Sequence, residues 1–225
     1  MDETSAVSQR VVVFDFDGVL VRGDSFESFL RSRLRAQPWR LLLALPVLPL
    51  VPLLMSTAAG KGWLARVFTR VATLGHGEAG FRRIVLAFAQ RFGANPGNFL
   101  ADGLAQVREH RAAGDRVIIA SATEGHLLDC LLHSLGLGEL ERCGSHVSAT
   151  WVGLRVHRHN YGEMKPVLLA EYFGLNRWNV AYSDAWSDLP LLQPADEAVL
   201  VNPTPALAQR YAQRLGARLQ VARWN

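Results

Sequence analysis

The stretch VVVFDFDGVLVRGDS, residues 11–25, places two aspartates one residue apart at the end of a wholly apolar run. The run VVVF is short and rich in β-branched residues, which is typical of a strand buried on both faces of a parallel sheet. Such a strand is expected to end in a neutral turn, but here Asp15 and Asp17 bring paired negative charge to its end. The pattern therefore predicts a cation or a reacting group at this edge of the sheet.

Apolar runs of the same kind recur along the chain, and helical patterns separate them. The runs are VIIA at 117–120, NVAY at 179–182 and AVLV at 198–201; the helical patterns cover 100–113, 125–136, 165–174 and 204–215. This alternation predicts an α/β fold with a doubly wound, Rossmann-like parallel sheet as its core. The period-2 stretches on either side of Gly153 predict a β-hairpin.

Residues 22–99 break the alternation, because they are helix-like and carry few strand signals. We expect them to form a helical cap inserted after the first strand, and residues 1–21 and 100–225 to form the core. An insertion at this point would lie over the carboxyl ends of the strands, where sheets of this type bind ligands.

Composition indicates a globular chain with a basic balance. Of 225 residues, 49% are apolar and 20% are charged, and the formal net charge is +4. The densest basic cluster (Arg31, Arg33, Arg35, Arg40) borders an apolar stretch, which favours an anionic membrane surface over nucleic acid as a partner. The two cysteines show no metal-ligand spacing, and the polar start MDETSAVSQR predicts a cytoplasmic site and no signal peptide.

Polar residues follow each predicted core strand or open the helix beyond it. After Asp15 and Asp17 come Ser121 in IIASATEG, Lys165 at the start of a helix, and Asp184 with Asp188 in YSDAWSDLPLL. Because the strands are parallel, we expect these side chains to meet at one edge of the sheet. Read singly, each has a structural alternative: Ser121 is typical of a helix N-cap, and the aspartates at 184 and 188 can cap a short helix.

The chemistry that fits this group is phosphoryl transfer to a carboxylate. Asp15 would attack phosphorus and become an aspartyl phosphate, and Asp17 would move the proton. Ser121 and Lys165 would hold phosphate oxygens and balance their charge. Lys165 is one of only two lysines among 24 basic residues, which indicates a need for a compact ammonium.

Carboxylates crowded into one pocket repel each other unless a cation neutralises them. Mg²⁺ prefers oxygen ligands and keeps waters and phosphate oxygens in its octahedron, so it is the cofactor we expect. Asp184 is the leading ligand candidate among the predicted metal residues. These residues are Asp15, Asp17, Asp184 and Asp188.

The four motifs resemble those of the haloacid-dehalogenase superfamily of phosphohydrolases, over residues 11 to about 203. The chain is most similar to the subfamily that includes phosphoserine phosphatase. The resemblance implies that Asp15 is the nucleophile, Asp17 the acid/base with a metal-binding backbone carbonyl, and Asp184 a Mg²⁺ ligand. Ala122 departs from the pattern, since glycine often follows the second-motif hydroxyl residue in the phosphate-binding loop.

Two cap residues keep alternative roles. Asp24 occupies the place where phosphoserine phosphatases carry a glutamate that recognises the substrate amine, but it can equally cap a helix that begins near Phe26. His76, in LGHGEAG, is either a loop residue that touches substrate or a turn residue. His157 and His159 are interpreted as hairpin surface rather than metal ligands, because Mg²⁺ rarely binds imidazole.

The cap contains a long apolar segment, 41–60, in which Leu41 to Met55 has no polar side chain. Three prolines would break a spanning helix, and a single span would separate Asp15 from Ser121, Lys165 and Asp184. We therefore expect this segment to lie in a membrane interface rather than to form a soluble cap core.

The segment from the first motif through the cap is similar to the phosphatidylglycerophosphatase C family of bacterial inner-membrane enzymes. The resemblance implies dephosphorylation of phosphatidylglycerophosphate to phosphatidylglycerol at the cytoplasmic face of the inner membrane. A soluble phosphatase of the phosphoserine type remains the alternative, followed by a catalytically silent phosphate-binding module on a membrane. The oligomeric state stays open.

Overall fold

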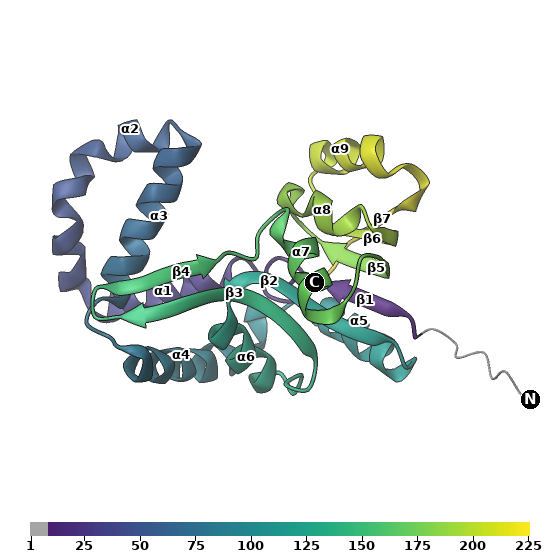
Figure 1. Cartoon of the computed structure of the whole chain (residues 1–225), viewed down its shortest axis with the longest axis horizontal. Helices are drawn as coiled ribbons and strands as arrows, with labels where there is room; N and C mark the ends of the chain where they lie inside the picture. Colours follow the sequence, from purple (N-terminus) through teal and green to yellow (C-terminus); the bar gives the residue numbers. More distant parts are fainter. Residues whose placement is uncertain (1–8) are drawn as a thin grey trace, which may run out of the picture.

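A seven-stranded sheet forms the centre of the molecule, in the order β4-β3-β2-β1-β5-β6-β7 (Figure 1). The computed structural model describes residues 9–225, so most of the polar start on which the signal-peptide prediction rests lies outside the described residues. Neighbouring strands run parallel except for the antiparallel pair β3 and β4. The predicted α/β fold with a doubly wound parallel core is confirmed.

The strands and helices follow the predicted alternation. The strands are β1 Val11–Phe14, β2 Arg116–Glu124, β3 Glu141–Thr150, β4 Gly153–Arg158, β5 Trp178–Ser183, β6 Ala195–Val201 and β7 Leu219–Ala222. The core helices are α5 Ala101–Ala112, α6 Gly125–Ser134, α7 Met164–Phe173, α8 Leu189–Leu192 and α9 Pro205–Leu215. Strand β7 was not predicted, because its four residues LQVA are partly exposed and carry no strong apolar run.

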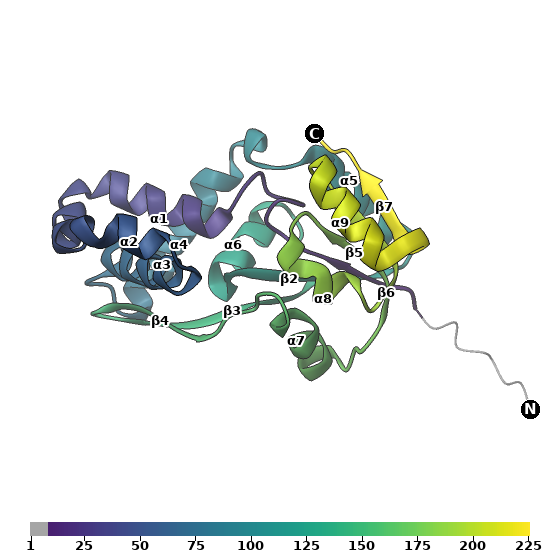
Figure 2. The ribbon, with the colours of Figure 1, turned by 90° about the horizontal axis from the view of Figure 1, so that it is seen from above.

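Helices cover both faces of the sheet (Figure 2). Val12 and Phe14 of β1 belong to a hydrophobic cluster with residues of α5 and α6. Val13 points to the other face and joins a cluster with residues of α7, α8 and α9. Burial on both faces explains why β1 reads as a continuous apolar run rather than as an alternation.

The chain between β1 and α5 holds the cap helices. They are α1 Ser25–Ala36, η1 Pro38–Leu50, α2 Val51–Met55, α3 Ala58–Thr73, α4 Glu78–Gly93 and η2 Pro96–Asn98. Helix α4 packs against α6, and its residues Phe81, Val85 and Phe88 belong to the same hydrophobic cluster as Phe14 of β1. Part of the cap is therefore anchored on the core, while the exact boundary at residues 22–99 stays a prediction.

The cap also rests on the β3–β4 hairpin, which extends beneath it. The backbone N–H of Gly75 donates to the carbonyl of Trp151 at 2.9 Å, and the N–H of Leu154 donates to Thr73 Oγ1 at 3.0 Å. These bonds tie the end of α3 to the hairpin.

The segment of residues 39–63, here called the apolar arm, forms an arch from η1 through α2 into α3 that projects away from the sheet (Figure 1). Prolines 46 and 49 lie within the 3-10 helix, where the missing N–H groups prevent a regular α-helix. The arm leaves the following side chains exposed: Trp39, Leu41, Leu42, Leu43, Leu45, Leu50, Leu53, Met55 and Trp63. Among the described helices, none is long and apolar enough to cross a bilayer.

Candidate active site

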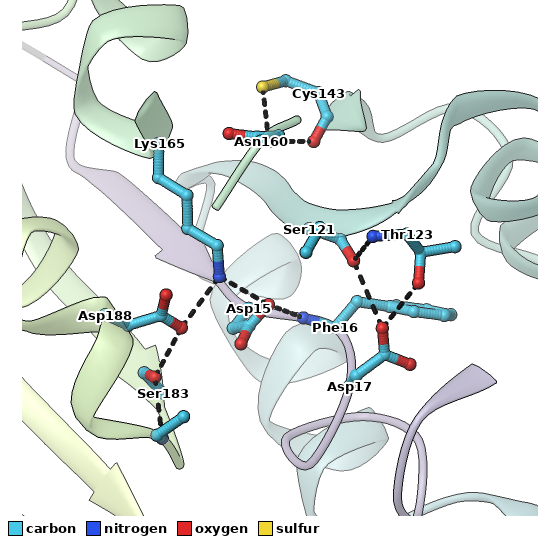
Figure 3. A network of polar contacts seen from close by, with 12 residues as sticks. Asp15, Phe16, Asp17, Ser121, Thr123, Cys143, Asn160, Lys165, Ser183 and Asp188 are labelled. Atoms are coloured by element: carbon cyan, nitrogen blue, oxygen red, sulfur yellow. Dashed lines mark hydrogen bonds and ion pairs between the residues drawn. The ribbon is translucent and has the colours of Figure 1, made fainter. Parts of the chain in front are cut away.

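Asp15 lies directly after β1 and is held at the sheet edge by backbone bonding. Its N–H donates to the carbonyl of Tyr182 at 2.9 Å, which extends the β1–β5 pairing by one residue. Its Oδ1 accepts from the N–H of Phe16 at 2.8 Å and lies 2.8 Å from Lys165 Nζ (Figure 3). Burial raises the pKa of Asp15, and the Lys165 ammonium opposes this rise.

Lys165 reaches the site from the first turn of α7 and is only 2% exposed. Its Nζ lies 2.8 Å from Asp15 Oδ1 and 2.8 Å from Asp188 Oδ2, so one ammonium bridges two carboxylates. Burial lowers the pKa of Lys165, but Asp15 and Asp188 raise it by more, and the net direction is upward. Lys165 is therefore a permanent positive charge beside the candidate nucleophile.

Asp188 is buried, and its Oδ2 also accepts from Ser183 Oγ at 2.8 Å. Asp188 Oδ2 therefore accepts from both Lys165 and Ser183. These bonds position Lys165, a role for Asp188 that the sequence did not indicate. The expectation that Asp188 binds the metal stays a prediction.

Asp17 points into the same space and accepts hydrogen bonds on both oxygens. Its Oδ1 accepts from the N–H of Ser25 at 2.8 Å, and its Oδ2 accepts from Thr123 Oγ1 at 2.6 Å. Burial raises the pKa of Asp17, while the bonds from Thr123 and Ser25 lower it. A carboxylate with a raised pKa is suited to carry a proton.

Ser121 contacts Asp17 but does not line the cavity. It is fully buried, its Oγ accepts from the N–H of Thr123 at 3.0 Å, and it lies 3.5 Å from Asp17 Oδ2. Ala122 lines the cavity in its place. The phosphate contact of Ser121 stays a prediction. The sequence indicated no role for the hydroxyl residues Thr123 and Ser25, which both bond Asp17.

Asp184 reaches the cavity from the end of β5 and packs on Gly18. Gly18 has a φ of +75°, and a Cβ at that position would overlap the Asp184 carboxylate. Glycine is therefore required at position 18, both for the left-handed backbone and for the close approach. Burial, followed by the nearby Asp188 charge, raises the pKa of Asp184 to about 6.

The donor set fits Mg²⁺ bound through a small number of carboxylates. Across residues 9–225, no three His, Cys, Asp or Glu side chains are grouped closely enough to hold a metal by themselves. Mg²⁺ is commonly bound through one or two carboxylates and completes its shell with waters and phosphate oxygens. Lys165 pairs with Asp15 and Asp188, whereas Asp17 and Asp184 form no ion pair in the described part of the chain. A partly buried carboxylate such as Asp184 without a cation is a suitable ligand.

These side chains surround a cavity of about 380 Å³. Its lining residues are Asp15, Asp17, Gly18, Gly23, Asp24, Ala122, Tyr161, Lys165, Asp184, Ala185, Ser187 and Asp188. Tyr161 is exposed at the mouth and stacks on His159 with a centroid distance of 5.4 Å. No sequence signal pointed to Tyr161, because a lone tyrosine before a glycine is an ordinary loop residue.

Asp24 caps a helix, as one of its two expected roles required, and its contact with a substrate amine stays a prediction. Its Oδ1 caps α1 by accepting from the N–H of Glu27 at 2.7 Å, and the residue also lines the cavity. His76 does not line it; its Nε2 lies 3.3 Å from Arg33 Nη2 within the cap. His157 bonds Ser148 Oγ at 2.8 Å on the hairpin, away from the carboxylates.

Comparisons with known proteins agree with the fold. Protein CicA of Caulobacter vibrioides (strain NA1000 / CB15N) is 29% identical over 194 residues, which cover 83% of each chain. A protein of unknown function from Bordetella pertussis Tohama I has a similar crystal structure, with a TM-score of 0.70, 20% identity, and coverage of 95% of this chain and 97% of the other. A phosphoserine phosphatase solved as a phospho-aspartyl intermediate analogue gives a TM-score of 0.52 at 15% identity, covering 95% and 92%.

At these identities the solved structures show a shared fold only. They do not support the resemblance to the phosphatidylglycerophosphatase C family. The family model for haloacid dehalogenase-like hydrolases, however, matches residues 12–193, which include all four motifs. The chain belongs to the haloacid dehalogenase-like hydrolases.

Proposed function

We propose that this protein is a Mg²⁺-dependent phosphomonoester hydrolase that works through an aspartyl phosphate on Asp15. The observation that carries the proposal is the buried Lys165 ammonium between Asp15 and Asp188, in the cavity that also holds Asp17. Lys165 favours the ionised form of the Asp15 carboxylate and attracts the phosphate group. The residues to which we assign catalysis, Asp15, Asp17 and Lys165, are all present, which disfavours a silent phosphate-binding module.

The chain's own residues account for both halves of the reaction. An oxygen of Asp15 attacks phosphorus, the bond to the leaving oxygen breaks, and Asp17 gives that oxygen a proton. Asp17 then takes a proton from water as the water attacks phosphorus, which breaks the aspartyl–phosphate bond and releases phosphate. The hydrogen bonds from Ser25 and Thr123 hold Asp17 in place for both transfers.

The residues that would hold Mg²⁺ are Asp15 and Asp184, together with the backbone carbonyl of Asp17. When bound, Mg²⁺ supplies positive charge that offsets the repulsion between carboxylates and phosphate.

The substrate we propose is a phosphomonoester carried by a membrane lipid, specifically phosphatidylglycerophosphate, with phosphatidylglycerol as product. The exposed apolar arm supports this choice, because monomeric soluble proteins rarely expose so much contiguous leucine. Charge supports it too: residues 22–99 hold eleven Lys and Arg against three Asp and Glu, a net charge of +8, while the remainder carries −4. A basic cap with an apolar arm matches the cytoplasmic face of an anionic inner membrane.

A small soluble phosphomonoester of the phosphoserine type is the second candidate. It is favoured by Asp24, which lines the cavity and offers a carboxylate oxygen to a substrate ammonium. In that case the apolar arm would be covered by another protein surface rather than by lipid.

A substrate panel tests the proposal. Phosphate release is measured from phosphatidylglycerophosphate in phosphatidylglycerol vesicles, from phosphoserine and from glycerol 3-phosphate, each with Mg²⁺ and with chelator. We expect the highest kcat/KM for the vesicle substrate and no turnover in chelator. Full activity in chelator would contradict the mechanism, and a preference for phosphoserine would contradict the lipid substrate.

A further inference from the structure

Two arginines inside the cap, Arg33 and Arg40, form no ion pair with the described part of the chain. Arg33 extends from α1, and Arg40 extends from the start of η1. Arg40 is only 3% exposed, and Arg33 is half-buried with its Nε fully enclosed and without a hydrogen-bond partner. Within residues 9–225, neither guanidinium pairs with a carboxylate.

Within residues 9–225, the groups that accept hydrogen bonds from these guanidiniums are neutral. Gln37 Oε1 accepts from Arg40 Nε at 2.5 Å and from Arg33 Nη2 at 3.2 Å. Arg40 Nη1 donates to the carbonyl of Val71 at 2.8 Å. His76 Nδ1 lies 2.9 Å from the carbonyl of Leu74, which makes it a donor and leaves Nε2 to accept from Arg33 at 3.3 Å.

A buried guanidinium without a neighbouring anion raises the free energy of the folded state. Burial lowers the pKa of Arg33, and the charges of Arg40 and Arg91 lower it further. An anion bound at Arg33 would offset the repulsion between the two guanidiniums. A phosphate group is the best match, because its oxygens accept the parallel N–H bonds of a guanidinium fork.

We propose that Arg33 and Arg40 form a second phosphate-binding site, separate from the catalytic cavity, whose occupant is the headgroup phosphate of an anionic membrane lipid. The site lies where the apolar arm begins, and the Arg40 guanidinium lies 5.1 Å from the ring centroid of the exposed Trp39. A lipid whose acyl chains lie along the arm would place its phosphate at this level, where tryptophan also prefers to reside. The site rests on the proposed membrane placement of the cap, and it requires no catalytic step.

Binding of the chain to vesicles tests this site. Wild type, Arg33→Gln and Arg35→Gln are compared on phosphatidylcholine vesicles with and without phosphatidylglycerol. Arg35 is exposed, lies two residues away on α1 and carries the same charge, so it is the matched control. Arg35→Gln should weaken binding to the anionic vesicles by about fivefold, the usual share of one basic residue near such a surface. Arg33→Gln should weaken it by about twentyfold or more, because a directed contact is also lost.

Inorganic phosphate separates the two sources of the anion. The rise in melting temperature on adding phosphate is measured for all three proteins, and the catalytic site contributes equally to each. The lipid site is supported if Arg33→Gln shows a smaller rise in melting temperature than the other two proteins and also the larger loss of vesicle binding. A smaller rise without any extra loss on vesicles assigns the site to free phosphate and overturns the lipid occupant. Arg33→Gln matching Arg35→Gln in both assays overturns the site altogether.

Two checks keep the result independent of folding and of catalysis. Without phosphate, Arg33→Gln should melt no lower than wild type, since it removes an uncompensated charge. Arg33→Lys keeps the charge but loses the fork, so binding as tight as wild type would contradict a directed phosphate contact. If wild type does not bind vesicles at all, the proposed membrane placement of the cap is wrong. A loss of vesicle binding confined to Arg33→Gln bears on the second phosphate site and not on the proposed activity.

Discussion

The catalytic edge of the sheet and the apolar arm of the cap differ in how their charged and apolar side chains are partnered. At the edge, Asp15 and Asp188 share the Lys165 ammonium, and Asp17 accepts hydrogen bonds on both oxygens. In the arm, leucines lie exposed, and the arginines at its base donate hydrogen bonds to neutral groups of the described residues. In the first region the chain supplies every group except the proposed Mg²⁺, and for the second region we propose a membrane as the partner. We infer that the edge determines the reaction and the arm determines where it occurs.

The edge is tested most severely at Asp15. Asp15→Asn should lower kcat by more than about 10⁴-fold, because an amide oxygen is a far weaker nucleophile than a carboxylate. Initial rates with a soluble aryl phosphate measure the loss, and circular dichroism melting checks that the fold is kept. A variant that turns over at the wild-type rate while folded would exclude Asp15 as the nucleophile.

Asp17 should show a loss that depends on the leaving group. Asp17→Asn removes the proton donor, so hydrolysis of alkyl phosphates should fall by about 10²–10⁴-fold. Aryl phosphates leave without much help and should fall far less. Equal losses for both substrates would assign Asp17 a structural role only.

Asp184 should make the metal-free protein less stable as the pH rises. Its folded pKa of about 6 lies above the ordinary value of 3.8, so the folded state binds this proton more tightly. The stability it contributes is greatest below about pH 4 and is lost as the pH rises through 6, a loss of about 3 kcal/mol by pH 7.

Asp184→Asn should therefore raise the melting temperature in chelator at pH 7 and have little effect near pH 4. The exposed Asp196→Asn variant is the control, since its ion pair with Arg177 is on the surface. A melting temperature that falls for Asp184→Asn at pH 7 would contradict the view that the site is strained without a cation.

The smallest effect is expected in the arm, from the triple variant Leu42→Ser, Leu45→Ser and Leu53→Ser. Because these side chains are exposed, the fold should survive, and affinity for anionic vesicles should fall by at least about tenfold through lost apolar burial. Flotation measures the binding. The control replaces three exposed apolar residues outside the arm: Leu86→Ser, Val167→Ser and Val221→Ser. Equal losses in both triple variants would indicate non-specific adhesion.

The sequence predicted the edge better than it predicted the arm. The apolar run before Asp15 and the four motifs were enough for the sheet, because parallel strands bring their carboxyl ends together whatever lies between them. The partners were not predictable: Asp188 with Lys165, and Thr123 and Ser25 with Asp17, meet only after distant segments pack. Likewise, composition showed that residues 41–60 are apolar, but not that η1 would leave the leucines exposed and enclose Arg40.

The central claim is that one site serves the chemistry while the arm brings it to a lipid substrate. It is tested most directly by the ratio of kcat/KM for phosphatidylglycerophosphate in vesicles to kcat/KM for a soluble aryl phosphate, in wild type and in the arm triple variant. We predict that the ratio falls by at least about tenfold in the variant, with turnover of the soluble substrate unchanged. A ratio that stays constant, with both activities retained or both lost together, would contradict the account.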